Sequence, residues 1–212
     1  MHAAFPRFTR EINQIMQLGA ANSAAVDLMD RAGGRLLAGG MAIMLKLGFT
    51  LLMKDSLLSM EGAKKAKSFF DENFVIVDPN ADGGQRYYQG KFLIRTKKDD
   101  DDMNVLLQFC PEPDKLFITT HFGRCLNPTS VVAAKALTES EAARIEKDPD
   151  QVDLVIRFKD VQSIKGLLKQ PDVDMAGLLL ENLVQLTGNL GHLFKFGAIA
   201  ANVEQTLDLP KL

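Results

Sequence analysis

The spacing of hydrophobic residues divides the chain into a helical part and a part that contains strands. Over residues 7–74, apolar side chains recur at steps of three and four positions, which is the spacing of one face of a helix. The pair Gly33-Gly34 ends the first predicted helix, a second covers residues 35–54, and Ser59 begins a third. We therefore expect an N-terminal block made entirely of helices.

After a turn-rich segment at residues 79–84, the apolar period changes to two. The runs at residues 87–97 and 103–109 alternate in this way around an acidic turn and predict a β-hairpin. Residues 115–122 follow as a third strand, so we expect this part of the sheet to be antiparallel. Thr138 with Glu141 forms a capping-box pattern and predicts a short helix.

The last third of the chain alternates between strands and helices. Residues 152–158 predict a strand whose inner face is wholly apolar. Asp160 is placed to cap a following helix, and a second helix comes after Pro171. Residues 182–187 predict a short strand, and Gly188-Asn189 then turns the chain into a final helix. A sheet with one apolar face and helices with apolar stripes form a core together.

Composition is that of a globular protein and disfavours nucleic acid as a partner. The 212 residues are 46% hydrophobic and carry a net charge of -2, so no basic field is available to attract phosphates. The two cysteines, Cys110 and Cys125, do not form a short-spaced metal or redox motif. Charged Arg7, Arg10 and Glu11 occupy the place of a signal peptide's apolar region. We expect a reduced, cytoplasmic protein.

Two stretches near the C-terminus resemble the sterol-carrier-protein-2-like family. They are VDLVIRFKDVQSIKGLL at residues 152–168 and LENLVQLTGNLGHLFKF at residues 180–196. The strongest feature is LTGNLGHLFK, in which a short strand, a Gly-Asn-x-Gly turn and an apolar helix follow one another as they do in family members. The resemblance covers residues 87–202. It implies an α+β fold, with a small twisted mixed sheet covered by helices, and an apolar tunnel that takes a fatty-acyl chain, a sterol or another lipid.

The resemblance also divides the chain into two regions. Residues 80–212 form the predicted sterol-carrier-like lipid-binding domain, and residues 1–79 form a helical N-terminal region outside the minimal domain. The connection at residues 122–151 is longer than is usual in the family. Both departures bear on the shape of the tunnel.

A tunnel in this fold would be lined by the apolar residues of the last strands and helices. Individually each of these side chains is typical of an ordinary core, and the resemblance makes them the predicted ligand-binding set. Its members are Leu154, Ile156, Phe158, Ile164, Leu167, Leu168, Met175, Leu178, Leu179, Leu193 and Phe194.

No set of residues in the sequence predicts catalysis, a metal or a cofactor. The three histidines, His2, His121 and His192, have no metal-ligand spacing. We interpret His192 as a surface residue at a helix start, with contact to a polar group of a ligand as the alternative. The acidic run at residues 99–102 lacks the glycine and distal glutamate of an EF-hand loop and predicts a solvated hairpin tip.

Residues 36–53 form an ambiguous segment that is apolar on nearly every side, with Lys46 near its middle. Insertion in a bilayer would cost about 2.5 to 3.5 kcal/mol for the lysine and gain roughly 0.3 to 0.6 kcal/mol for each large apolar residue, a sum near zero. We interpret it as a buried packing helix. A helix that makes transient contact with a membrane or a partner is the alternative.

These observations favour a non-enzymatic protein that binds or transfers a hydrophobic lipid, which is fatty acyl, sterol-like or isoprenoid. Two alternatives stay open. The chain is a protein-interaction or scaffold module whose N-terminal helices dock a partner, or it is an accessory domain that presents a lipid to a biosynthetic enzyme.

Overall fold

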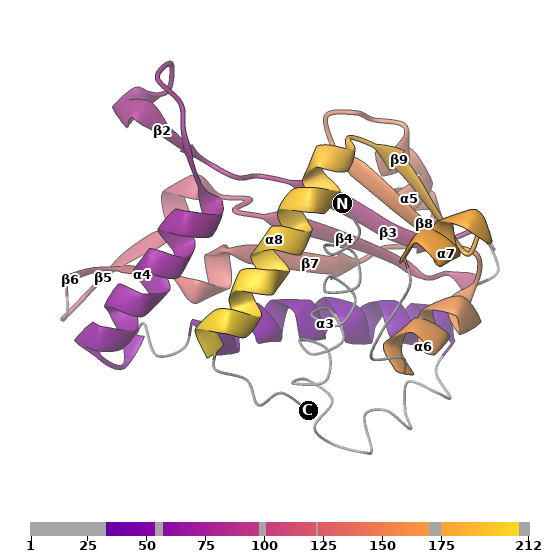
Figure 1. Ribbon diagram of the computed structural model, residues 1–212, viewed down its shortest axis with the longest axis horizontal. Helices are drawn as coiled ribbons and strands as arrows, with labels where there is room; N and C mark the ends of the chain where they lie inside the picture. The colour runs from indigo at the N-terminus through magenta and orange to yellow at the C-terminus, as the bar shows by residue number, and fades with distance from the viewer. Residues whose placement is uncertain (1–32, 54–56, 98–100, 122, 170–174, 208–212) are drawn as a thin grey trace.

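The structure of the chain is a computed structural model (Figure 1). It describes residues 33–53, 57–97, 101–121, 123–169 and 175–207. The first predicted helix, which precedes Gly33, lies outside the described residues, as does the segment around Pro171.

A five-stranded mixed sheet forms the centre of the molecule, in the order β7-β4-β3-β8-β9. β3 and β8 are parallel and the other neighbours are antiparallel. The strands are β3 (Lys91–Thr96), β4 (Asn104–Phe109), β7 (Val132–Ala136), β8 (Leu154–Phe158) and β9 (Val184–Gly188). The mixed α+β fold class is therefore confirmed, as is the hairpin, which β3 and β4 form.

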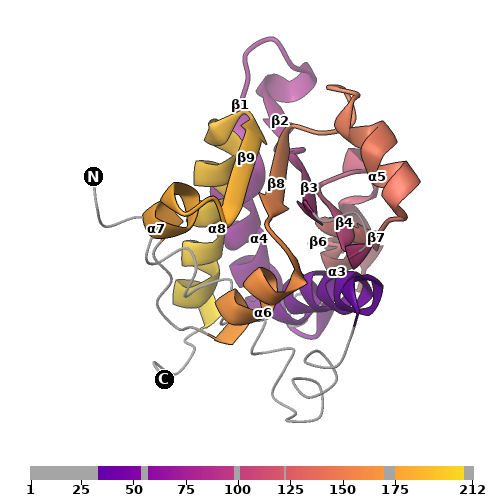
Figure 2. The same ribbon diagram turned by 90° about the vertical axis from the view of Figure 1, so that its right-hand side faces the viewer.

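One face of the sheet carries the main hydrophobic core. Because side chains alternate along a strand, Phe92 and Ile94 of β3 lie on the same face as Leu154 and Ile156 of β8, which are their partners in the parallel register. Among the described residues, the helices that contribute buried side chains to this core lie on this face, and the last helix crosses it diagonally (Figures 1 and 2). They are α3 (Gly34–Leu52), α4 (Met60–Phe74), α6 (Val161–Lys169) and α8 (Leu190–Leu207).

The opposite face of the sheet is covered by α5 (Glu139–Glu146), as Figure 2 shows. Thr138 caps this helix and forms the predicted capping box with Glu141. Ala142 and Ile145 of the helix pack on Leu93 in a second, smaller hydrophobic cluster. The sheet is thus buried on both sides along part of its length.

Several helix ends follow the local sequence signals. Ser59 accepts a hydrogen bond from the Gly62 N–H at the start of α4, and Asp160 accepts one from the Ser163 N–H at the start of α6. The predicted acidic hairpin tip also takes part in a cap, because the carboxylate of Asp101 accepts the Val161 N–H at 2.8 Å. The carboxylate of Asp101 therefore binds the protein backbone and is not simply part of a solvated hairpin tip.

α3 contains most of the ambiguous apolar segment and packs on β7 and β4. One face of the helix is buried in the core, while Leu36, Ile43 and Lys46 are exposed. This agrees with the interpretation as a packing helix. No helix in the described ranges is long and apolar enough to cross a membrane.

The prediction for the middle of the chain is wrong in one respect. The predicted third strand, β5 (Phe117–Thr120), pairs with β6 (Gly123–Leu126) in a separate two-stranded sheet and does not join the hairpin. The chain leaves the main sheet after β4, at Cys110 with φ 42° and the short 3-10 helix Pro113–Lys115. β7, which the sequence pattern did not predict, pairs with β4 instead.

The alternating pattern of residues 152–158 places Val152 on the apolar inner face with Leu154 and Ile156, and this placement of Val152 is wrong. The strand begins only at Leu154, so Val152 is outside its alternation and packs with Ile145 in the cluster under α5. Val155, on the face of β8 that also carries Arg157, belongs to the same cluster because α5 covers it.

The predicted domain boundary lies in a small hairpin. β1 (Val75–Val77) pairs with β2 (Gln85–Tyr87) across the turn-rich residues 79–84. The hydrophobic core runs across this point, because Phe70 and Phe74 of α4 pack in the same cluster as Phe109 of the sheet. The division at residue 79 stays a prediction.

Candidate functional site

A polar and aromatic cluster lies where α8 begins beside the sheet. The hydroxyl oxygen of Tyr88 is 2.9 Å from Nδ1 of His192. The two rings are stacked, with centroids 5.6 Å apart and an interplanar angle of 28°, and Phe92 meets the imidazole edge-on. His192 is thus half-buried, and the interpretation as a simple surface residue is wrong because the aromatic rings of the sheet reach it.

The backbone around Gly188 places the histidine. Gly188 ends β9 with φ 118°, and a Cβ atom at this position would collide with the carbonyl oxygen of Asp153. Asn189 then donates its backbone N–H to that same carbonyl, and its side chain accepts the Gly191 N–H at 2.8 Å. This cap turns the chain into α8 and directs His192 toward the sheet.

Asp153 is the acidic member of the cluster. Its Oδ2 accepts the backbone N–H of Lys91 at 2.8 Å, which anchors the carboxylate at the start of β3. Its Oδ1 lies 3.9 Å from Nε2 of His192. This distance exceeds that of a direct hydrogen bond.

The surroundings of Tyr88 affect the pKa of its hydroxyl group. Burial, and to a smaller extent the charge of Asp153, raises the pKa of Tyr88, so the phenol keeps its proton at neutral pH. A neutral imidazole holds one proton, and the carboxylate facing Nε2 favours that position. In the tautomer with the proton on Nε2, His192 donates toward Asp153 and accepts the hydroxyl proton of Tyr88 at Nδ1, whereas in the other tautomer Nδ1–H donates to the Tyr88 oxygen.

Lys195 completes the cluster one turn along α8. Its ammonium lies 5.9 Å from the centroid of the Tyr88 ring, in a cation–π arrangement. Partial burial lowers the pKa of the lysine. Within the described part of the chain, this ammonium has no carboxylate partner.

The cluster offers hydrogen-bond donors and acceptors and one cation at the edge of the apolar core. No group of three or more His, Cys, Asp or Glu side chains in the described ranges is arranged to hold a metal ion. His121 is exposed, far along the chain from this cluster, and His2 lies outside the described residues.

The predicted ligand-binding residues divide into four groups. Leu154, Ile156, Ile164 and Leu193 are buried in the main core, and Phe158 and Leu178 are partly buried against it. Leu179 and Phe194 are exposed. The side chains of three further members lie outside the described residues, namely Leu167, Leu168 and Met175.

The apolar core reaches the surface on both sides of β9. α7 (Met175–Leu180) precedes this strand and α8 follows it. Leu180 of α7 is 83% exposed, and Leu190 and Phe194, one turn apart on α8, are 48% and 57% exposed. Leu190 and Phe194 flank His192 in sequence, so polar and exposed apolar groups share the first turns of α8.

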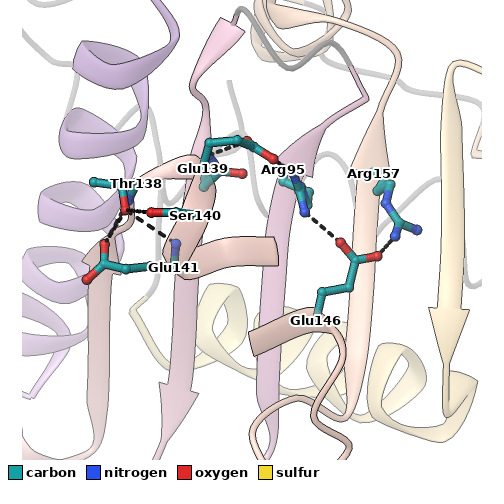
Figure 3. Close-up of polar contacts among 8 residues, drawn as sticks. Arg95, Thr138, Glu139, Ser140, Glu141, Glu146 and Arg157 are labelled. Atoms are coloured by element: carbon teal, nitrogen blue, oxygen red, sulfur yellow. Dashed lines mark hydrogen bonds and ion pairs between the residues drawn. The ribbon is translucent and has the colours of Figure 1, made fainter. Parts of the chain in front are cut away.

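A second polar cluster lies on the opposite face of the sheet (Figure 3). Arg95 of β3 binds Glu139 and Glu146, at the two ends of α5, and the Glu146 carboxylate also binds Arg157 of β8. Arg95 is only 7% exposed. Because each arginine has a carboxylate partner and both glutamates belong to α5, we interpret this cluster as the attachment of α5 to the sheet.

Three members of the first cluster were not predicted. Tyr88 and Asp153 look like ordinary strand residues, and Lys195 looks like a solvated helix residue. The turn sequence Gly-Asn-Leu-Gly-His was the one signal that marked the region, since function concentrates on such connections. Nothing local connects Tyr88 to His192, which are 104 residues apart.

Comparison with models of protein families, with curated proteins and with solved structures found no match. The sterol-carrier-protein-2-like resemblance therefore stays a prediction from the sequence.

Proposed function

We propose that this protein binds or transfers a hydrophobic lipid without chemically changing it. The ligand's apolar part would pack between the sheet and helices α6, α7 and α8, the helices that, together with β8, carry the predicted ligand-binding residues. Its polar end would lie at the Tyr88–His192 cluster. The resemblance to sterol-carrier-like proteins and the mixed sheet covered by helices both support this proposal.

The observation that carries the proposal is the meeting of apolar and polar groups at the start of α8. Leu193 is buried in the core, whereas Phe194, next to it, is exposed. The first turns of α8 therefore have one side in the core and an apolar side chain at the surface. His192 and Lys195 occupy the same two turns. An amphiphilic ligand needs this combination, because its chain must leave water and its head group must keep hydrogen bonds.

The energetics suit such a ligand. Burial of a methylene contributes about 0.8 kcal/mol, so a long acyl or isoprenoid chain offsets the entropy that binding costs. The buried leucines and phenylalanines of the core have no polar atoms that would oppose it.

Native mass spectrometry tests the proposal most directly. The purified protein is expected to carry a bound mass that organic extraction removes, and the extract identifies the lipid. Delipidated protein should then bind long-chain lipids saturably. A mass equal to the bare chain, unchanged after incubation with mixed lipids, would refute lipid binding.

Exposed residues of α3 support a second candidate, a protein-interaction module. Leu36 and Ile43 are 69% and 60% exposed, two turns apart on one side of the helix. Deleting the N-terminal region would remove part of the core, so the double variant Leu36→Glu with Ile43→Glu is the better test. Loss of a co-purifying protein in this variant, with no lipid bound to the wild type, would favour the interaction module.

A further inference from the structure

We propose that the cluster at the start of α8 recognises a neutral hydroxyl head group, held between Nε2 of His192 and Oδ1 of Asp153. This inference rests on the proposed lipid-binding function and names the chemistry of the ligand's polar end.

The spacing of the two atoms suits one bridging oxygen. Nε2 and Oδ1 are 3.9 Å apart, too far for a direct hydrogen bond but close enough for an oxygen at about 2.8 Å from each. Such an oxygen would form an angle of roughly 90° between its two partners, which a hydroxyl group tolerates. Both side chains are partly exposed to solvent.

The two partners differ in hydrogen-bonding character. Nε2–H is the donor in the tautomer that the facing Asp153 carboxylate favours, and in that tautomer Nδ1 accepts the proton of Tyr88. Oδ1 of Asp153 is an acceptor, and Oδ2 is already held by the Lys91 N–H. A hydroxyl group both accepts and donates, so it satisfies both partners.

Other head groups fit this pair less well. A carboxylate would accept from His192 but would face the negative charge of Asp153. An ether or ester oxygen accepts one hydrogen bond and leaves Oδ1 without a donor. The ammonium of Lys195 would attract an acid, but it lies over the Tyr88 ring.

The test compares three ligands of equal chain length: a long-chain primary alcohol, its methyl ether and the corresponding carboxylic acid. Equilibrium binding to the delipidated full chain should be about tenfold tighter for the alcohol than for the ether, the effect of one hydrogen bond. The alcohol should also bind more tightly than the acid. Equal affinities for all three ligands, or tightest binding of the acid, would overturn the hydroxyl assignment but leave lipid binding intact. If none of the three ligands binds, the proposed function itself is refuted.

The variant Asp153→Asn provides a second measurement. Its amide oxygen can keep the Lys91 N–H, so the amide nitrogen would face the ligand as a donor. The preference for alcohol over ether should then disappear, and binding of the acid should increase. Asp150→Asn is the matched control, because Asp150 is exposed and its carboxylate has no contact with His192 among the described interactions. An unchanged preference in a folded Asp153→Asn protein would overturn the assignment.

Discussion

The hydroxyl of Tyr88 and Nδ1 of His192 lie 2.9 Å apart, although the two residues are 104 positions apart in sequence. The contact connects the segment that precedes β3, the central strand of the sheet, to the first turn of α8. It therefore has two consequences, one for the orientation of the imidazole and one for the attachment of the last helix.

Removing the hydroxyl should weaken this attachment. In Tyr88→Phe the ring stack with His192 is kept and the hydrogen bond is lost, so we expect the free energy of unfolding to fall by about 1 kcal/mol. Urea denaturation measures the change. Tyr87→Phe is the matched control, because Tyr87 makes ring contacts with Phe70 and Phe117 but has no hydroxyl hydrogen bond in the described structure. Equal effects of the two variants would contradict the prediction.

Gly188 should not tolerate a side chain. The variant Gly188→Ala places a methyl group against the Asp153 carbonyl at a φ of 118°, and strain of this kind costs about 1 to 3 kcal/mol. Thermal or urea unfolding should show the loss. Gly39→Ala, in α3, is the control, and it should raise the free energy of unfolding. Its Cβ would meet nothing within 4 Å, and alanine is the better helix former by about 1 kcal/mol. An unchanged free energy of unfolding in Gly188→Ala would show that this turn can rearrange to accept a side chain.

Substitution of Arg95 should lower the free energy of unfolding far more than the loss of an exposed ion pair does. Arg95→Met leaves the half-buried Glu139 and Glu146 without their shared partner, and breaking a buried pair costs about 3 to 5 kcal/mol. We expect a value near the lower end, about 3 kcal/mol, because Glu139 can regain water and Glu146 keeps Arg157. Lys135→Met breaks the exposed pair with Glu141 and should change the free energy of unfolding by less than about 1 kcal/mol. Similar losses in both variants would argue against a structural role for the buried network.

The capping box of α5 should contribute to acid sensitivity. The backbone N–H of Thr138 and its hydroxyl hold the pKa of Glu141 below its ordinary value of 4.5. The folded state therefore binds this proton less readily than the unfolded state, so the contribution is present above pH 4.5 and is lost as the pH falls through the lowered pKa.

Glu141→Gln separates this effect from the cap itself. Glutamine can still accept the Thr138 N–H but does not titrate. Free energies of unfolding measured between about pH 6 and pH 3 should fall less steeply in the variant than in the wild type. Parallel pH profiles would show that Glu141 does not contribute to acid unfolding.

Local signals in the sequence determined the elements whose ends depend on neighbouring residues. The capping box at Thr138 and the cap at Asp160 predicted α5 and α6 correctly, and the alternating pattern predicted the hairpin of β3 and β4. The Gly188-Asn189 turn predicted the start of α8. In each case the partners are a few residues apart, so the sequence alone contains the information.

Only the tertiary structure decided which strands are neighbours and which side chains meet. Alternation shows that β8 has apolar faces but not that it lies parallel to β3, and it does not assign the edge position to β7 instead of β5. The candidate site depends on the same long-range pairing. The Lys91 N–H reaches Asp153 only because β3 and β8 lie side by side, and His192 meets Tyr88 only because α8 packs on that face. Contacts between segments this far apart arise from the packing of the whole core, which no local pattern records.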